Sequence, residues 1–427
     1  MLVLLLTLFS QSASARVLTW SECVALVSKN NPELAAARSN SASSEELLSG
    51  ASSGFLPVLT GSVNANYNFP NSSTSALAFT SLAGNTIGST QSNKVAYSSA
   101  LTLSYNLFSG FRDRASMARA RANRMIAAAN LDSINAKVSY ELRQAFVNLD
   151  YAKSYVQLTE SIRERRFQNE RLVRAQYESG RENQGSDLLS QSVLEQADYE
   201  QLQARHRASL AAQALAHVLG EDSSDLDITG EIPMTRPKET FNELELLPLT
   251  PVHRTEEAQE ALAQANVNYA RSAFYPSLDF SASVVNRSDL LYLSDKQQWS
   301  MGLSLSVPIF SGFKTYHDTR SAKDLEKVSY FNRVASDFDT LNQLRMAFFT
   351  FQESLLKLKA DRASLNAITV QEKIARKQYN NGLLKFENWD IIESNLISAQ
   401  KAALASQRDR ILAESNWRQL QGQGDLP

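Results

Sequence analysis

The sequence predicts a mainly α-helical chain that also contains four amphipathic β-strands. The chain consists of two halves with the same architecture. Three observations support this fold class. Two long stretches lack the residues that break helices, four segments alternate apolar and polar side chains, and the same landmarks recur 202 residues apart. The long helices are expected to pack as antiparallel coiled coils.

The composition argues against several classes of protein. The chain has 427 residues with 43 basic and 45 acidic side chains, which leaves no positive excess for binding nucleic acid. Its four histidines are scattered and its single cysteine cannot form a disulfide within the chain, so we predict no metal and no cofactor. We find no H-E-x-x-H or P-loop motif and expect no enzyme. No apolar run reaches the roughly 18 residues of a membrane-spanning helix.

The first 15 residues have the features of a signal peptide. Residues 2–9 are almost purely apolar, and Ala13 and Ala15 fit the small-residue pattern of a signal-peptidase site. The mature chain would then begin near Arg16, outside the cytoplasm; the alternative is a buried N-terminal helix. Cys23 follows in a helical context, as a small core residue or as a reactive thiol.

Long helices are predicted where proline and glycine are absent. Neither residue occurs within 112–179 or 313–381. We predict long helices at 113–177, 185–219, 314–378 and 385–420. The first would be about 98 Å long at the ~1.5 Å rise per residue of an α-helix, a length that requires a coiled coil or a helical tube. Seven-residue spacing supports this; it relates Leu131, Val138, Ala145 and Ala152.

Shorter helices begin each half of the chain. Thr19, Ser21 and Glu22 belong to a capping box, so the first helix should begin at Thr19 and end at Gly50 or Gly54. Thr250-Pro251 has the N-cap and first-turn residues of another helix. Between the halves, residues 221–250 are acidic at first and then contain prolines, and we predict a connector there.

The halves, 16–220 and 251–422, form an internal repeat. The match is strongest in the sequence Phe108-Ser109-Gly110-Phe111, which recurs 202 residues later as Phe310-Ser311-Gly312-Phe313. The same offset relates three further pairs: Tyr177 and Tyr379, Gly180 and Gly382, and Gly220 and Gly422. Each half would therefore contain a helix, two strands, a long helix, a turn and another long helix.

Four segments show the two-residue period of a β-strand, at 57–69, 94–108, 277–287 and 298–310. One face of each is mainly Leu, Val and aromatic, and the other is mainly Ser, Thr and Asn. A soluble sheet packed on a helix gives such alternation too. Four long strands with a small and almost uncharged polar face are, however, typical of transmembrane strands with lipid outside and water inside.

Aromatic residues gather where the strands meet the helices. On the transmembrane interpretation they form an interfacial girdle, and on the soluble one they are a local core. They are Phe55, Phe108, Phe111, Phe274, Phe310 and Phe313. Five arginines at 112–124 follow the second strand, where they would either meet lipid headgroups or form a solvated helix face.

Four strands cannot close a barrel, and an open sheet edge is not tolerated in lipid. If the strands cross a membrane, copies of the chain must therefore associate through their sheet edges. Two copies would give a barrel of eight strands, and side chains would about fill the interior of such a barrel. Three copies would give twelve, the smallest multiple of four that should leave a useful lumen.

The chain resembles the TolC-type outer-membrane efflux proteins over essentially its whole mature length. The resemblance lies in Leu18-Thr19-Trp20, in Asn30-Asn31-Pro32-Glu33-Leu34, in the Phe-Ser-Gly-Phe junctions and in the Tyr-x-x-Gly turns. It implies a homotrimer with a 12-stranded barrel in the outer membrane, in contact with its lipid, and a helical tunnel, or α-barrel, in the periplasm. It also implies a periplasmic adaptor and an inner-membrane pump of RND, ABC or MFS type as partners, for efflux or type I secretion.

The resemblance places the two Tyr-x-x-Gly turns at the periplasmic tip, where the tunnel closes. Tyr177, Gly180, Arg181, Tyr379 and Gly382 would form this end. Family members often carry an aspartate six residues after the glycine, where this chain has Ser186 and Asn388. Neighbouring acids would either contribute to the gate or stabilise a helix N-terminus. They are Asp187, Glu387 and Asp390.

Other functions remain open at this stage. A periplasmic coiled-coil adaptor or scaffold with a soluble β domain would share the helices and the strands. A hydrolase is a third possibility, for which the chain offers no Cys/His pair at suggestive spacing. Trp389 is either a stacking surface for a ligand or a residue of helix packing.

Overall fold

The structure is a computed structural model that describes residues 16–67, 95–221, 226–235, 242–288 and 296–426. The predicted signal peptide lies outside the described residues. The chain divides into two compact units. We call Ser43–Arg124 with Ala258–Tyr330 the strand unit, and Met1–Ala42, Met125–Glu257 and Phe331–Pro427 the helical unit.

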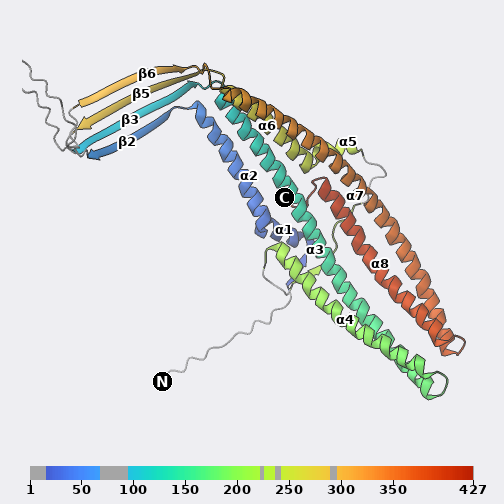
Figure 1. Ribbon diagram of the computed structural model, residues 1–427. Coiled ribbons are helices and arrows are strands. Elements are labelled where there is room, and N and C mark those ends of the chain that lie inside the picture. The colour runs from blue at the N-terminus through green and yellow to red at the C-terminus, as the bar shows by residue number, and fades with distance from the viewer. Residues whose placement is uncertain (1–15, 68–94, 222–225, 236–241, 289–295, 427) are drawn as a thin grey trace, which may run out of the picture. The chain divides into compact units, whose positions relative to one another are not determined.

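The strand unit contains one antiparallel sheet of four strands. Its order is β2-β3-β5-β6, so β2 and β6 are the outer strands (Figure 1). The bounds are Val58–Tyr67 for β2, Val95–Phe108 for β3, Ser277–Ser288 for β5 and Lys296–Ser306 for β6. The prediction that the last strand continues to 310 was wrong, because Pro308 has no amide donor and disfavours ladder pairing at that point.

The same tight turn joins sheet to helix in both halves. Gly110 and Phe111 have φ of 65° and 69°, and Gly312 and Phe313 have 61° and 63°. Positive φ is uncommon for a residue other than glycine, so its occurrence at two phenylalanines 202 residues apart is a structural sign of the internal repeat. At Gly110 a Cβ would lie only 2.9 Å from the Ser272 carbonyl oxygen.

Four long helices account for nearly half of the chain (Figure 1). They are α3 Arg112–Glu178, α4 Gln184–Leu219, α7 Lys314–Asn380 and α8 Phe386–Leu420. In the helical unit, α3 buries small residues at Ala129, Ala136 and Ala145, and larger ones at Leu142 and Leu149. The alanines let neighbouring helices approach closely, while the leucines fill the space between them.

The first predicted helix is in fact two helices. The capping box at Thr19 is present, and α1 runs over Trp20–Asn30 before α2 begins at Pro32 and ends at Ala51. A single helix was the wrong prediction, because the residue before a proline is disfavoured in the α region. Asn31 is extended, and its side-chain oxygen accepts a bond from the Leu34 amide at 3.0 Å, so it caps α2.

The described part of the connector includes a strand that pairs with the first strand of the chain. β1, Arg16–Thr19, pairs in parallel with β4, Leu226–Thr229. The connector also contains α5, Glu243–Leu246, and a short 3₁₀ helix, Leu247–Leu249. The helix α6 then begins at Pro251 and ends at Ser272. The two-stranded sheet was not predicted.

The main core of the helical unit surrounds α1. Cys23 is fully buried there, and Trp20 meets Phe146 edge-to-face at 5.5 Å. Burial, and then the charge of Glu22, raise the pKa of the Cys23 thiol to about 11. A thiol with so high a pKa forms little thiolate, so Cys23 is a core residue and not a reactive one.

Candidate functional site

The sheet has one apolar and one polar face, as the alternation predicted. Register aligns Leu59, Leu103, Ala282 and Met301 in one row across the four strands. The next row on the same face is Gly61, Leu101, Val284 and Trp299. Polar residues form the alternate rows, as in Thr60, Thr102, Ser283 and Ser300, where the two serine hydroxyls lie 2.8 Å apart.

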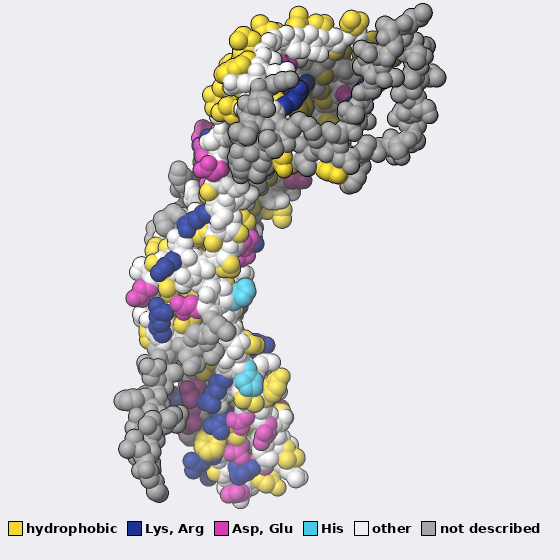
Figure 2. Space-filling model, turned by 90° about the vertical axis from the view of Figure 1, so that its left-hand side faces the viewer, with side chains coloured by type: hydrophobic (Ala, Val, Ile, Leu, Met, Phe, Trp, Pro, Cys, Tyr) yellow, Lys and Arg dark blue, Asp and Glu magenta, His cyan; other side chains and the backbone are white. Residues whose placement is uncertain are grey.

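The apolar face is not covered by any described helix of the strand unit. Met301 is 83% exposed and Trp299 is 74% exposed, and Leu303 and Leu305 are similar. Figure 2 shows hydrophobic side chains gathered over this part of the chain. Large exposed apolar patches mark contact with protein or lipid. The interpretation as a soluble sheet packed on a helix is therefore wrong for the described residues.

Both sheet edges are open. Within the described ranges, no strand pairs with the outer side of β2 or of β6. Their unpaired backbone groups would need partners in any environment without water.

The predicted aromatic residues lie at the junctions between strands and helices. Phe108 meets Phe111 edge-to-face at 5.2 Å, and Phe310 meets Phe313 in the same way at 5.5 Å. Phe55, Phe274, Phe310 and Phe313 nonetheless remain about half or more exposed. The local pairs hold the rings in place and leave their outer surfaces available for an apolar medium.

Two of the arginines after the second strand have local partners. Arg124 pairs with Glu45, and the guanidinium of Arg119 lies 4.8 Å from the ring centre of Tyr269. Both contacts lie within the strand unit.

The two Tyr-x-x-Gly turns have the same backbone. Gly180 has φ of 75° and Gly382 has φ of 70°. In the first turn the Arg181 amide donates to the Gln176 carbonyl at 2.8 Å, and in the second the Leu383 amide donates to the Gln378 carbonyl at 2.8 Å. These are Schellman-type helix ends, in which a left-handed glycine lets the chain reverse into the next helix.

The tyrosines of these turns have different surroundings. Tyr177 and Arg181 are exposed, whereas Tyr379 is 1% exposed and stacks on Trp389 at 4.4 Å between ring centres. The Tyr379 hydroxyl donates to Glu182 at 3.3 Å, which ties the second turn to the first. Burial, and then the neighbouring Glu182, raise the pKa of Tyr379. Trp389 is a packing residue, since its buried ring is inaccessible to a ligand.

The three predicted acids do not form a set. Asp390 pairs with Arg166 of α3, and Asp187 accepts from Gln191 at 3.0 Å and lies 3.6 Å from Arg174. Glu387 is exposed. Arginines of the same chain thus neutralise two of the three acids, Asp187 and Asp390.

A buried carboxylate that the sequence analysis missed lies one turn further along α8. Glu393 is fully buried and lies 3.0 Å from Arg165 and 3.6 Å from Arg376. Burial raises the pKa of Glu393, with a further rise from Glu372, while the arginines act in the opposite direction. Only the helix phase, which places Asp390 and Glu393 toward α3, could have revealed it.

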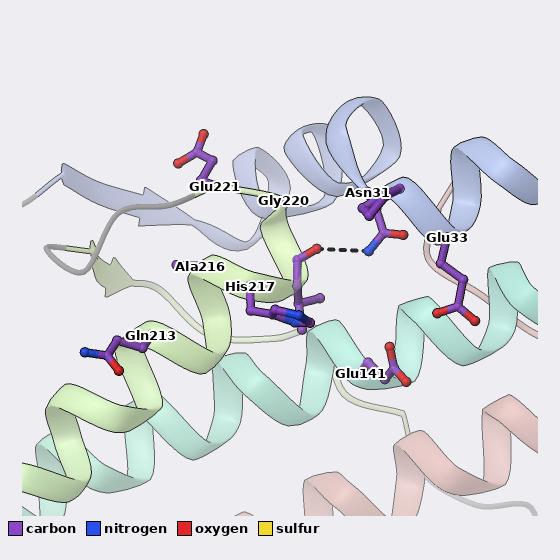
Figure 3. Close-up of a pocket in the computed structure, with 10 residues that line it drawn as sticks. Asn31, Glu33, Glu141, Gln213, Ala216, His217, Gly220 and Glu221 are labelled. Carbon is purple, nitrogen blue, oxygen red and sulfur yellow. Dashed lines mark hydrogen bonds between the residues drawn. The ribbon is translucent and has the colours of Figure 1, made fainter.

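A groove of about 600 Å³ lies where α4 ends beside the junction of α1 and α2 (Figure 3). The Asn31 side chain donates to the Val218 carbonyl at 3.1 Å across it. Glu33 and Glu141 also line the groove, and Lys137 binds Glu33 at 2.6 Å. Gly220 is required here, since a Cβ would lie 2.6 Å from the Asn30 carbonyl oxygen. The groove lies where these helix ends pack together, and the side chains that line it do not form a catalytic arrangement.

Three features bear on other functions. Gly50-Ala51-Ser52-Ser53-Gly54 has the G-x-S-x-G spacing of hydrolases, but it lies at the end of α2 and in a 3₁₀ helix, not in a strand-to-helix elbow. Within the described residues, no three His, Cys, Asp or Glu side chains gather as metal ligands do. No helix in that part of the chain is both long and apolar enough to cross a bilayer.

The comparisons with known proteins agree with this geometry. The family described as outer membrane efflux protein matches residues 24–221 and 254–423. The chain belongs to this family. Its members belong to the outer membrane, and so does this chain.

Individual relatives are distant. The alkaline protease secretion protein AprF of Pseudomonas aeruginosa is 23% identical over 284 residues, which are 64% of this chain and 57% of AprF. The toluene efflux pump outer membrane protein TtgC of Pseudomonas putida is 26% identical over 189 residues, 42% of this chain and 38% of TtgC. The match thus spans about half or less of these relatives' lengths.

Solved structures share the fold over nearly the whole chain. The CmeC outer membrane channel of Campylobacter jejuni has a TM-score of 0.81 at 17% identity, covering 94% of this chain and 85% of CmeC. The MtrE outer membrane channel of Neisseria gonorrhoeae, in its open state, has a TM-score of 0.78 at 20% identity, covering 95% and 89%. The predicted fold class and family resemblance are confirmed.

Proposed function

We propose that this chain is one subunit of an outer-membrane exit channel, through which an efflux or type I secretion system releases small toxic compounds or secreted proteins. One observation carries the proposal: a four-stranded sheet has a bare apolar face, a polar opposite face and two open edges. Lipid would cover the apolar face and water would fill the space at the polar one. Secretion by AprF and efflux by TtgC, as their names state, are the two uses we infer for the duct.

The open edges imply partners of the same kind. An edge in lipid must be paired, and β6 of one copy can pair with β2 of the next. Three copies would supply twelve strands and a water-filled lumen, whereas the eight strands of two copies would be filled by side chains. The internal repeat, 16–220 and 251–422 around the connector 221–250, would then give each copy two similar portions of the wall.

The channel would be passive. The described residues offer no catalytic constellation, so the energy for export would come from an inner-membrane pump of RND, ABC or MFS type, coupled through a periplasmic adaptor. We further infer that the two turns at Gly180 and Gly382 form the periplasmic tip, where contacts between α3 and α8 hold the duct closed.

Extraction and conductance test this proposal against a soluble scaffold. The protein should be released from outer membranes only by detergent, and the purified protein should give discrete conductance steps in a planar bilayer. A protein that washes off in salt and gives no conductance would instead be the coiled-coil adaptor or scaffold.

A further inference from the structure

We propose that a groove between α6 and α7 in the strand unit binds the headgroup of an anionic phospholipid. The inference rests on the proposed function, because it takes the strands next to these helices as membrane-spanning. The groove has a volume of about 580 Å³ and is lined by basic and aromatic side chains. Those that carry the argument are Arg271 and Phe274 at the end of α6, and Tyr316, Thr319, Arg320 and Lys323 in α7.

The groove holds positive charge that the chain does not neutralise. Within the described residues, Arg271, Arg320 and Lys323 make no ion pair or hydrogen bond. The groove's one acid, Asp324, is paired with Lys327 at 3.0 Å. Three unpaired cations therefore face one space, although acidic and basic residues nearly balance over the chain as a whole. Such a site favours an anion with several oxygen atoms, such as a phosphate diester.

The lining of the groove also includes a buried hydroxyl. Thr319 lines the groove and is only 9% exposed, yet its Oγ1 has no hydrogen-bond partner among the described atoms. A buried hydroxyl without a partner costs free energy, so most find one. In helices, threonine often bonds to the carbonyl one turn earlier, as Thr369 does with Leu365 at 2.6 Å, but Thr319 does not.

The order of side chains along the groove matches the order of layers at a membrane surface. Phe274 and Tyr316 lie nearest the strands and are about half exposed, as aromatic residues at the level of the acyl–headgroup boundary are. Arg320 and Lys323 follow about 9 and 14 Å along α7 from its first residue, at ~1.5 Å per residue. Helical side chains lean toward the N-terminus of their helix, so both lean back toward the strands and the headgroup layer.

Association of copies would leave this groove open. In the sheet, β5 and β6 are neighbours, α6 precedes β5, and α7 follows β6. The groove therefore lies between consecutive elements of one chain, whereas copies would meet along the outer edges of β2 and β6. The exposed aromatic rings favour lipid as the occupant over an anion in a water-filled lumen.

Native mass spectrometry of the full-length channel with added phosphatidylglycerol tests the inference. The double variant Arg320→Gln/Lys323→Gln should bind this lipid roughly thirtyfold more weakly than wild type, since it loses two basic residues near an anionic surface. The matched control, Lys359→Gln/Arg362→Gln, removes the same charge from exposed positions of α7 outside the groove and should bind like wild type. Wild-type channel should also prefer phosphatidylglycerol over phosphatidylcholine.

Three outcomes would overturn the inference. They are equal lipid binding by the groove and control variants, no preference for the anionic lipid, or displacement of the lipid by inorganic phosphate, which would make free phosphate the ligand. Measuring the conductance of the same preparations distinguishes failure of the headgroup site from failure of the channel proposal. If wild type conducts while the groove variant binds lipid normally, only the headgroup site fails; if wild type does not conduct, the channel proposal itself fails.

Discussion

At the scale of single residues, the repeat has kept the backbone of the tip and changed its side-chain contacts. Tyr177 and Tyr379 are equivalent, but Tyr379 alone is buried against Trp389 and bonded to Glu182. Asp390 adds an ion pair to α3 through Arg166. Contacts with α3 and with Tyr379 therefore fix the position of α8 at this end.

Removing these contacts should loosen the tip. Tyr379→Ala and Asp390→Ala should each raise single-channel conductance in a planar bilayer, because α8 loses its stacking partner or its ion pair. Glu387→Ala removes an exposed carboxylate from the same helix end and should leave conductance unchanged. Unchanged conductance for both Tyr379→Ala and Asp390→Ala would remove these residues from the gate.

Equivalent glycines provide a second test. Gly110 and Gly312 both have positive φ, which costs a residue with a Cβ about 1–2 kcal/mol. An added Cβ at Gly110 would also meet Ser272 and Tyr275 at 2.9 Å, whereas at Gly312 nothing lies within 4 Å. Gly110→Ala should therefore lower the melting temperature in detergent clearly more than Gly312→Ala does. Equal losses would mean that the close packing at Gly110 is unimportant.

A buried ion pair near the C-terminus should make stability depend on pH. Burial would raise the pKa of Asp425, but bonds and charges from Arg143 and Arg418 outweigh it and hold the pKa below the ordinary value of 3.8. The carboxylate therefore stabilises the fold fully above that value, and the stabilisation is lost as pH falls through the lower folded-state pKa.

Asp425→Asn should accordingly cost about 3–5 kcal/mol at neutral pH, because it leaves the buried Arg143 without its carboxylate. Denaturant titrations of variant and wild type should begin to converge as pH falls below about 4, and should coincide only below the lower folded-state pKa of Asp425. Asp409→Asn is the control, since its pair with Arg408 is exposed and worth about 0–1 kcal/mol. A difference that persists unchanged in acid would contradict the assigned ion pair.

At the scale of elements, the sheet should distinguish its two faces. Leu303 lies on the apolar face of β6 and Ser304, opposite Asp279, on the polar face. Leu303→Lys should destabilise insertion by about 2–4 kcal/mol if that face meets lipid, while Ser304→Lys should be tolerated. The amount of heat-resistant oligomer in outer membranes measures this. Similar yields for the two variants would refute a lipid-facing surface.

Local patterns were enough to predict most elements and not enough to predict their contacts. The long helix expected at 113–177 is observed at Arg112–Glu178, because the absence of proline and glycine is a strong and local signal. The break at Asn31 was not predicted, because the capping box and the following alanines favoured one helix. Pro32 was the local signal for this break. The β1–β4 pair joins segments about 210 residues apart, and no local period reveals such pairing.

The sequence was enough to locate the site residues along the chain, but not to predict which side chains they contact. The duplicated turns identified Tyr379 and Gly382, and the adjacent acids were found because they stand beside the turns. Whether an acid is paired depends on which face of α8 meets α3, so Arg166 and Glu393 could not be assigned from spacing alone. The groove between α6 and α7 likewise joins residues from two elements about 50 residues apart in the chain.

At the scale of the whole molecule, a channel requires that the open sheet be completed by other strands. A single chain leaves an exposed apolar face and two unpaired edges, which neither water nor lipid can satisfy alone. The mass of the detergent-extracted channel, measured by native mass spectrometry, tests this most directly. We expect three copies of the chain in one particle; a stable single copy that needs no detergent would contradict the account.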